Sequence, residues 1–235
     1  MRRLKSDIPT GAKENIIQQY EDKRIEQGGV VNLETRECTI DGKVVGWRSY
    51  DSEGRLVTET ALKDGKKHGR QIFWNEDGTI DFVEPFFEGK VHGTAKQYQE
   101  GKLIGTYKMV HGTGYDVWRG DRGDGVVLVS EIHPMRDGLP HGFEWWLNED
   151  QQSVYEEKHW FNGKFHGIER EWNFKNKLRR GYPKYWVRGG AVTKRQYVAA
   201  ARKDATLPPF RLKDNSPKRE FPPEIRRLLN VPKKK

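Results

Sequence analysis

The sequence predicts an all-β protein, an elongated single-layer antiparallel meander of about six β-hairpin repeats with a capping helix near each terminus. Three observations predict this fold. A short glycine phrase recurs at a nearly fixed spacing, an aromatic residue follows each copy, and only 34% of the residues are hydrophobic while 33% are charged. A period of about 24 residues is typical of repeat architectures, in which each unit packs on its neighbours.

The recurring phrase is Gly-x-x-His-Gly. Its two glycines and its histidine are Gly65, His68 and Gly69, then Gly89, His92 and Gly93, then Gly138, His141 and Gly142, and finally Gly163, His166 and Gly167. An earlier copy at residues 42–46 has Val45 in place of the histidine, and Gly112 falls where a missing copy would lie. We expect these glycines to supply positive φ angles at turns between hairpins, where a Cβ would clash.

Each unit has the pattern of a hairpin. Four or five residues after the second glycine comes an aromatic residue, followed by a turn signal such as Asn-Glu-Asp-Gly at 75–78 and a second apolar stretch such as 82–87. Between Ile168 and Trp172 the apolar and charged residues alternate with a period of two, which indicates a strand rather than a helix.

These residues resemble MORN-type repeats, because the glycine phrase and its aromatic are joined by a Gly-x-Leu or Gly-x-Ile return at 54–56, 78–80 and 101–103. The variant with histidine before the second glycine is most similar to the bacterial YwqK-like antitoxin family, over roughly residues 41–180. The resemblance implies a non-enzymatic protein-binding scaffold whose partner is a toxin with an active site that it blocks. The broader MORN resemblance implies an alternative, a scaffold associated with anionic lipid.

The two ends of the chain differ from the repeats. Residues 1–29 are expected to form an N-terminal helical cap, with a helix over 11–27 that stops at two glycines, and residues 30–190 the repeat array. Thr193 is a good N-cap for a C-terminal helix within 191–206. Both helices would cover exposed sheet edges. Residues 207–235 form a Pro-rich basic tail, expected to lie extended on the surface or to be partly disordered.

The formal net charge of +9 is concentrated at the C-terminal end. Residues 211–235 hold nine Lys and Arg against three Asp and Glu, whereas residues 30–210 hold 28 against 26. A groove that tracks phosphates needs basic residues along one face, so the composition argues against nucleic acid as a partner. Lys233, Lys234 and Lys235 would tether the tail to an anionic membrane in the lipid alternative, or they are simply solvated.

No pattern in the sequence predicts an enzyme, a cofactor or a metal centre. There is no nucleophile beside a base, no cluster of metal ligands and no phosphate-cradling loop. Histidines of adjacent hairpins should lie about 9 to 10 Å apart, too far to share one Zn²⁺. We expect each to bond to the backbone of its own turn or to stack on a neighbouring aromatic, with a pH-sensitive binding face as the alternative.

The single cysteine, Cys38, excludes an internal disulfide and favours a reducing compartment, most simply the cytoplasm. Its setting has the pattern of a strand, so we expect an inert side chain. No apolar window has the length of a signal peptide or membrane span.

Regularly spaced aromatics are the candidates for a partner-binding face, since Trp and Tyr contribute large contact areas at little entropic cost. They are Trp74, Tyr98, Trp118, Trp146 and Trp172. The alternative is that they serve only the packing of the sheet. Residues 110–137 depart from the repeat phrase, and functional individuality is expected there.

Overall fold

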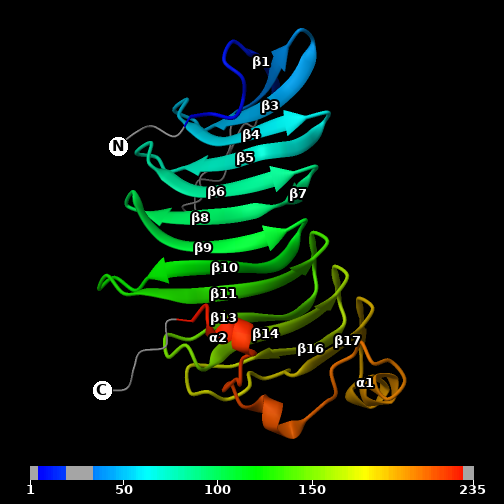
Figure 1. Ribbon diagram of the computed structural model, residues 1–235. Helices are drawn as coiled ribbons and strands as arrows, with labels where there is room; N and C mark the ends of the chain where they lie inside the picture. Colours follow the sequence, from blue (N-terminus) through cyan, green and yellow to red (C-terminus); the bar gives the residue numbers. More distant parts are fainter. Residues whose placement is uncertain (1–4, 20–33, 230–235) are drawn as a thin grey trace. The chain divides into compact units, whose positions relative to one another are not determined.

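The computed structural model describes residues 5–19 and 34–229. The chain divides into two compact units, Met1–His111 and Gly112–Lys235. In each unit consecutive strands pair antiparallel as hairpins of an open sheet, which confirms the predicted all-β meander (Figure 1).

In the first unit each strand lies beside the next along the chain, apart from the two-residue β7, after which β8 continues the pairing with β6. The strands are β1 (Lys13–Gln19), β2 (Glu34–Ile40), β3 (Lys43–Tyr50), β4 (Leu56–Lys63), β5 (Lys66–Trp74), β6 (Ile80–Phe87), β7 (Lys90–Val91), β8 (Gly93–Gln99) and β9 (Lys102–Val110).

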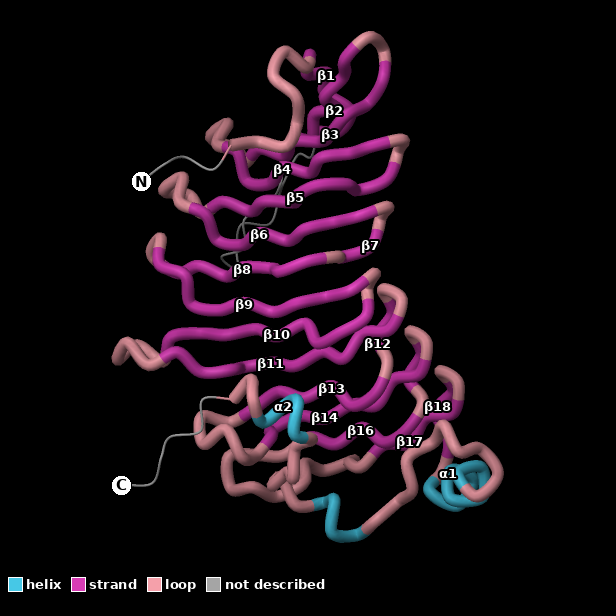
Figure 2. The backbone as a smooth tube through the Cα atoms, viewed as in Figure 1, coloured by secondary structure: helices cyan, strands magenta, loops and turns pink. Residues whose placement is uncertain are grey.

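The second unit repeats this plan and adds the helices (Figure 2). Its strands are β10 (Thr113–Asp121), β11 (Val127–Arg136), β12 (Leu139–Pro140), β13 (Gly142–Leu147), β14 (Val154–Phe161), β15 (Lys164–Phe165), β16 (Gly167–Glu171), β17 (Lys184–Val187) and β18 (Gly190–Val192). They are followed by α1 (Lys194–Ala201), a 3₁₀ turn at Leu212–Asn215 and α2 (Pro223–Arg226).

The first glycine of the repeated phrase closes a two-residue hairpin turn. In the turn between β11 and β12, Asp137 and Gly138 have φ angles of 53° and 83°, and Glu88 and Gly89 between β6 and β7 have 50° and 84°. Two successive positive φ angles define the type I′ turn, whose twist matches that of the flanking strands. The positive φ angles expected of these first glycines are therefore observed, but the expected Cβ clash is not, because an added Cβ at Gly138 would meet no atom within 4 Å.

The histidines of the phrase connect one hairpin to the next. Nδ1 of His92 accepts a hydrogen bond from the backbone N–H of His111, 3.2 Å away, and Nδ1 of His166 accepts one from Arg188, 3.0 Å away. The sequence predicts two alternatives for each ring, a bond to the backbone of its own turn or a contact with a neighbouring aromatic. At His92 and His166 the backbone donor belongs to the following hairpin, whereas the ring of His68 lies 5.1 Å from that of Phe87 at an interplanar angle of 47°.

A threonine takes the place of the histidine in the irregular copy. Oγ1 of Thr113 accepts a hydrogen bond of 3.1 Å from the backbone N–H of Asp137, and the N–H of Gly138 donates to the carbonyl of Gly112 at 2.9 Å. The same carbonyl contact recurs between Gly163 and Pro140. The copy at Gly112 is therefore shortened, but its link to the next turn is kept.

The N-terminal helix predicted over 11–27 is wrong at residues 13–19, which form β1 on the edge of β2. Residues 11 and 12 are not helical either, and residues 20–27 lie outside the described residues. Glu14 of β1 accepts hydrogen bonds from Arg36, Arg48 and Tyr50. These partners come from β2 and β3, so strand pairing provides hydrogen bonds that an isolated helix over the same residues would lack. Ile8 packs in a buried cluster with Cys38, where burial raises the pKa of the thiol.

At the other end, helix α1 begins where the sequence predicts. The hydroxyl of Thr193 accepts from the backbone N–H of Gln196, whose side chain accepts in return from the Thr193 N–H. Tyr197 of α1 is buried against Ile168 and Leu207. The helix therefore covers part of the sheet that β16 and β17 form.

The described part of the predicted tail, residues 207–229, lies along the surface with many exposed side chains, and it is also anchored to the sheet at several points. Phe221 meets the ring of Trp145 edge-on at 5.4 Å, and Ile225 is fully buried. The backbone N–H of Val154 donates to the carbonyl of Pro217 at 3.0 Å. The apolar side chains spaced among the prolines and charges give this segment a buried face. Lys233, Lys234 and Lys235 lie outside the described residues.

Candidate binding surface on the second unit

The five aromatic residues predicted to contact a partner differ in how exposed their side chains are. Trp118 in β10 is 37% exposed, and Trp74, Tyr98 and Trp146 are half-buried. Trp172, which follows β16, is only 3% exposed, and its indole N–H donates to the carbonyl of Asn215 at 2.8 Å. Trp172 therefore packs under the C-terminal segment and is removed from the candidate contacts with a partner.

Strand register places Trp118 and Trp146 in one row across the second unit. Trp118 lies opposite Glu131, Glu131 opposite Trp146, Trp146 opposite Glu156, and Glu156 opposite Glu171. Residues directly opposite in an antiparallel pair project from the same face with neighbouring side chains. We name this face of β10, β11 and β13 to β17 the acidic-aromatic face.

A second row on the same face centres on His133. Its Nδ1 bonds to Glu144, and its Nε2 lies 2.9 Å from a carboxylate oxygen of Glu131. The ring of Trp146 meets the imidazole edge-on at 5.5 Å. Burial opposes protonation, but hydrogen bonds to Glu144 and Glu131 and the charge of nearby Asp116 outweigh it, so the pKa of His133 is raised above its ordinary value.

A third set of aromatics on this face is held by carboxylates. The indole N–H of Trp160 donates to Glu144 at 2.6 Å, and that of Trp186 donates to Glu169 at 2.9 Å. Phe165 stacks between the two indoles, at centroid distances of 4.0 and 5.2 Å. Sequence reasoning missed both tryptophans, although each stands two residues before a positive-φ turn.

The acidic-aromatic face gathers more negative than positive charge. Six carboxylates belong to its rows: Asp116, Glu131, Glu144, Glu156, Glu169 and Glu171. Lys158 pairs with Glu156 at 2.6 Å and lies over the ring of Trp146, Lys184 reaches Glu169, and Arg179 pairs with Glu171. The local excess of acid contrasts with the basic chain as a whole.

The raised pKa of His133 predicts a pH-dependent contribution to stability. Because the folded state binds this proton more tightly, the contribution is fully present below the unfolded pKa of about 6.5 and is lost as the pH rises through the folded value. In urea unfolding, His133→Gln should destabilise the protein by about 1 kcal/mol more at pH 6 than at pH 9. A difference that grows with pH would contradict this assignment.

The comparison with His133→Gln is needed because other histidines have pKa values that are lowered in the folded state, so their contributions to stability depend on pH in the opposite direction. Burial lowers the pKa of His159 and of His166, so their contributions are present above pH 6.5 and fade as the pH falls. The difference between wild type and variant at each pH isolates the His133 contribution.

The opposite face of the second unit carries a buried cluster around Glu157. This carboxylate accepts hydrogen bonds from Arg170 at 2.7 Å, from Arg219 at 2.6 Å and from the indole of Trp145 at 2.9 Å. Glu157 and Arg170 face each other across β14 and β16, and Arg219 arrives from the C-terminal segment. The cluster fastens that segment to the sheet.

The described part of the chain shows neither a metal-ion cluster nor a membrane-spanning helix. Residues 5–19 and 34–229 contain no group of three or more His, Cys, Asp or Glu side chains placed to hold a metal ion. No helix within those ranges has both the length and the apolar character required to cross a bilayer.

The acidic-aromatic face is therefore the candidate functional surface, with Trp118, Glu131, His133 and Trp146 at its centre. Three of these four residues lie within residues 110–137, the region that departs from the repeat phrase. No family model, curated protein or solved structure matches this chain, so the resemblance to MORN-type and YwqK-like proteins rests on the repeated phrases of the sequence alone.

Proposed function

We propose that this protein is a non-enzymatic protein-binding scaffold and that it contacts its partner through the acidic-aromatic face. The row from Trp118 through Glu131 and Trp146 to Glu156 carries this proposal. Tryptophans anchored on a rigid sheet are frequent hot spots of protein interfaces. Carboxylates between them add a requirement for cationic groups on the partner.

The partner that fits this face presents Lys or Arg side chains around an apolar contact. A toxin that binds an anionic substrate would have such a basic surface, and this protein would then block it as an antitoxin. An anionic lipid surface fits less well, because the carboxylates of the face would be repelled by negatively charged headgroups.

The proposal is tested by affinity capture from the lysate of the native host, with the full chain as bait. The double variant Trp118→Ala and Trp146→Ala should lose at least about 90% of the captured partner, since each removed anchor contributes about 2 kcal/mol or more to binding. Phe174→Ala is the matched control, because Phe174 is a 92% exposed aromatic in the turn after β16, outside these rows.

Circular dichroism of each variant establishes that the fold is retained. The captured protein is then purified and its affinity for wild type and variants is measured directly. Equal affinity for the wild type and the double variant would eliminate the acidic-aromatic face as the contact surface.

A further inference from the structure

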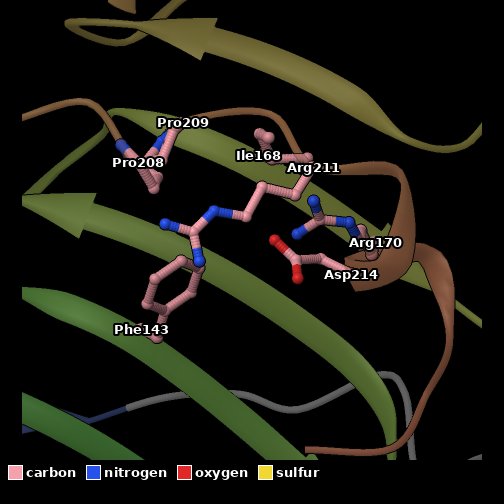
Figure 3. A pocket seen from close by; sticks show the side chains of 7 residues that line it. All are labelled: Phe143, Ile168, Arg170, Pro208, Pro209, Arg211 and Asp214. Atoms are coloured by element: carbon pink, nitrogen blue, oxygen red, sulfur yellow. The ribbon is translucent and has the colours of Figure 1, made fainter.

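A small cavity lies between the sheet of the second unit and the C-terminal segment, on the face opposite the acidic-aromatic face. Its volume is about 150 Å³. It is lined by Phe143, Ile168, Arg170, Pro208, Pro209, Arg211 and Asp214 (Figure 3). In Figure 3 the guanidinium group of Arg211 lies beside Phe143 and Pro208, and the carboxylate of Asp214 lies between it and the guanidinium group of Arg170.

Arg170 supplies a buried cation with an incomplete set of partners. The residue is 2% exposed; its Nη1 donates to Glu157 at 2.7 Å and its Nε to the side-chain oxygen of Asn215 at 3.3 Å. Its Nη2 is buried and has no hydrogen-bond partner. Figure 3 shows this guanidinium turned toward the space that Arg211 and Asp214 also border. A buried donor left unpaired is costly, and more so on a charged group.

The charges around the cavity leave a positive excess. Glu157 is shared between Arg170 and Arg219, so one carboxylate faces two guanidinium groups. At the cavity itself Arg211 and Asp214 carry opposite charges. The cluster as a whole is one negative charge short, in a place where desolvation makes an uncompensated cation expensive.

We propose that the cavity binds a small organic carboxylate, which accepts hydrogen bonds from the guanidinium groups of Arg170 and Arg211. A carboxylate provides the missing negative charge and two acceptor oxygens in the plane that guanidinium groups prefer. A short apolar chain on the acid would contact Pro208 and Phe143. Asp214 disfavours a phosphate dianion more than a carboxylate. The dianion would place two negative charges beside Asp214, whereas a carboxylate places only one. The size of the cavity favours a free small acid over a peptide terminus.

Isothermal titration calorimetry of the full chain with sodium propionate tests the proposal, with propionamide as the uncharged analogue and sodium chloride at equal ionic strength as the blank. We expect the protein to bind propionate with a stoichiometry of one and to show no binding of propionamide. Arg211→Ala should weaken propionate at least tenfold, and Asp214→Asn should tighten it severalfold.

Arg211 is exposed, so its replacement leaves the fold intact, and Lys213→Ala is the matched control because it removes the same charge two residues away, outside the cavity lining. Wild-type affinity in Lys213→Ala is expected. Equal weakening by Arg211→Ala and Lys213→Ala would reduce the effect to general electrostatic attraction and overturn the site. Heats no larger than those of sodium chloride, or tighter binding of phosphate than of propionate, would also overturn it.

Discussion

Replacing Glu157 with alanine should lower the free energy of unfolding by about 3 to 5 kcal/mol, because it leaves the guanidinium groups of Arg170 and Arg219 without their shared buried carboxylate. The indole N–H of Trp145 loses its acceptor in the same step. Chemical denaturation measures the loss. We also expect faster proteolysis within residues 207–229, because Arg219 and Phe221 fasten that segment to the sheet.

The neighbouring residue Glu156 is the matched control. It lies on the acidic-aromatic face, and its ion pair with Lys158 is partly solvated, with side-chain exposures of 23% and 21%. Glu156→Ala should cost less than about 1 kcal/mol, as partly exposed ion pairs usually do. Similar losses for the two variants would mean that the buried cluster does not hold the C-terminal segment.

Gly112→Ala should destabilise the second unit by about 3 kcal/mol, since backbone strain and steric overlap add at this position. Its φ angle is 74°, and an added Cβ would lie 2.4 Å from the backbone nitrogen of Gly138 and 2.9 Å from its Cα. Backbone atoms cannot move aside as a flexible side chain can. The clash would break the link to the next turn, in which Gly138 donates to Gly112 and Asp137 to Thr113.

Gly138→Ala separates these two effects. Gly138 has a similar φ of 83°, but a Cβ there would meet no atom within 4 Å. Its replacement should therefore cost only the conformational penalty of about 1 kcal/mol. Thermal or urea unfolding of the two variants gives the comparison, and equal costs would show that the close approach at Gly112 is relieved by a shift of the turn.

The hairpin fold could be predicted because its determinants are local. A two-residue turn with two positive φ angles selects glycine strongly, so turns such as Asp137–Gly138 are visible in the sequence. The N-cap of α1 at Thr193 is local in the same way. Strand β1 could not be predicted, because Glu14 depends on Arg36 and Arg48, which are brought to it only by the pairing of β1, β2 and β3.

The candidate surface was predictable only in part. The sequence singles out Trp118 and Trp146, but their alignment through Glu131 depends on strand register and on the bulges that shift it. The acidic character of the face could not be read from composition, since the net charge of +9 averages over both faces and the basic C-terminal end. Trp172 was misassigned because its covering segment arrives from more than 40 residues downstream.

The closure of the Glu157 cluster by Arg219 sets an order of events during synthesis. The two residues are 62 positions apart, and a ribosome adds about 5 to 20 residues per second, so β14 emerges roughly 3 to 12 s before the arginine that completes its cluster. Throughout that interval the nascent sheet exposes Trp145 and an unfinished ion cluster. The C-terminal segment is therefore the last part of the second unit to complete its packing. Chains that end before residue 219 would keep Trp145 and the Glu157 cluster exposed, and we expect proteases and chaperones to recognise them.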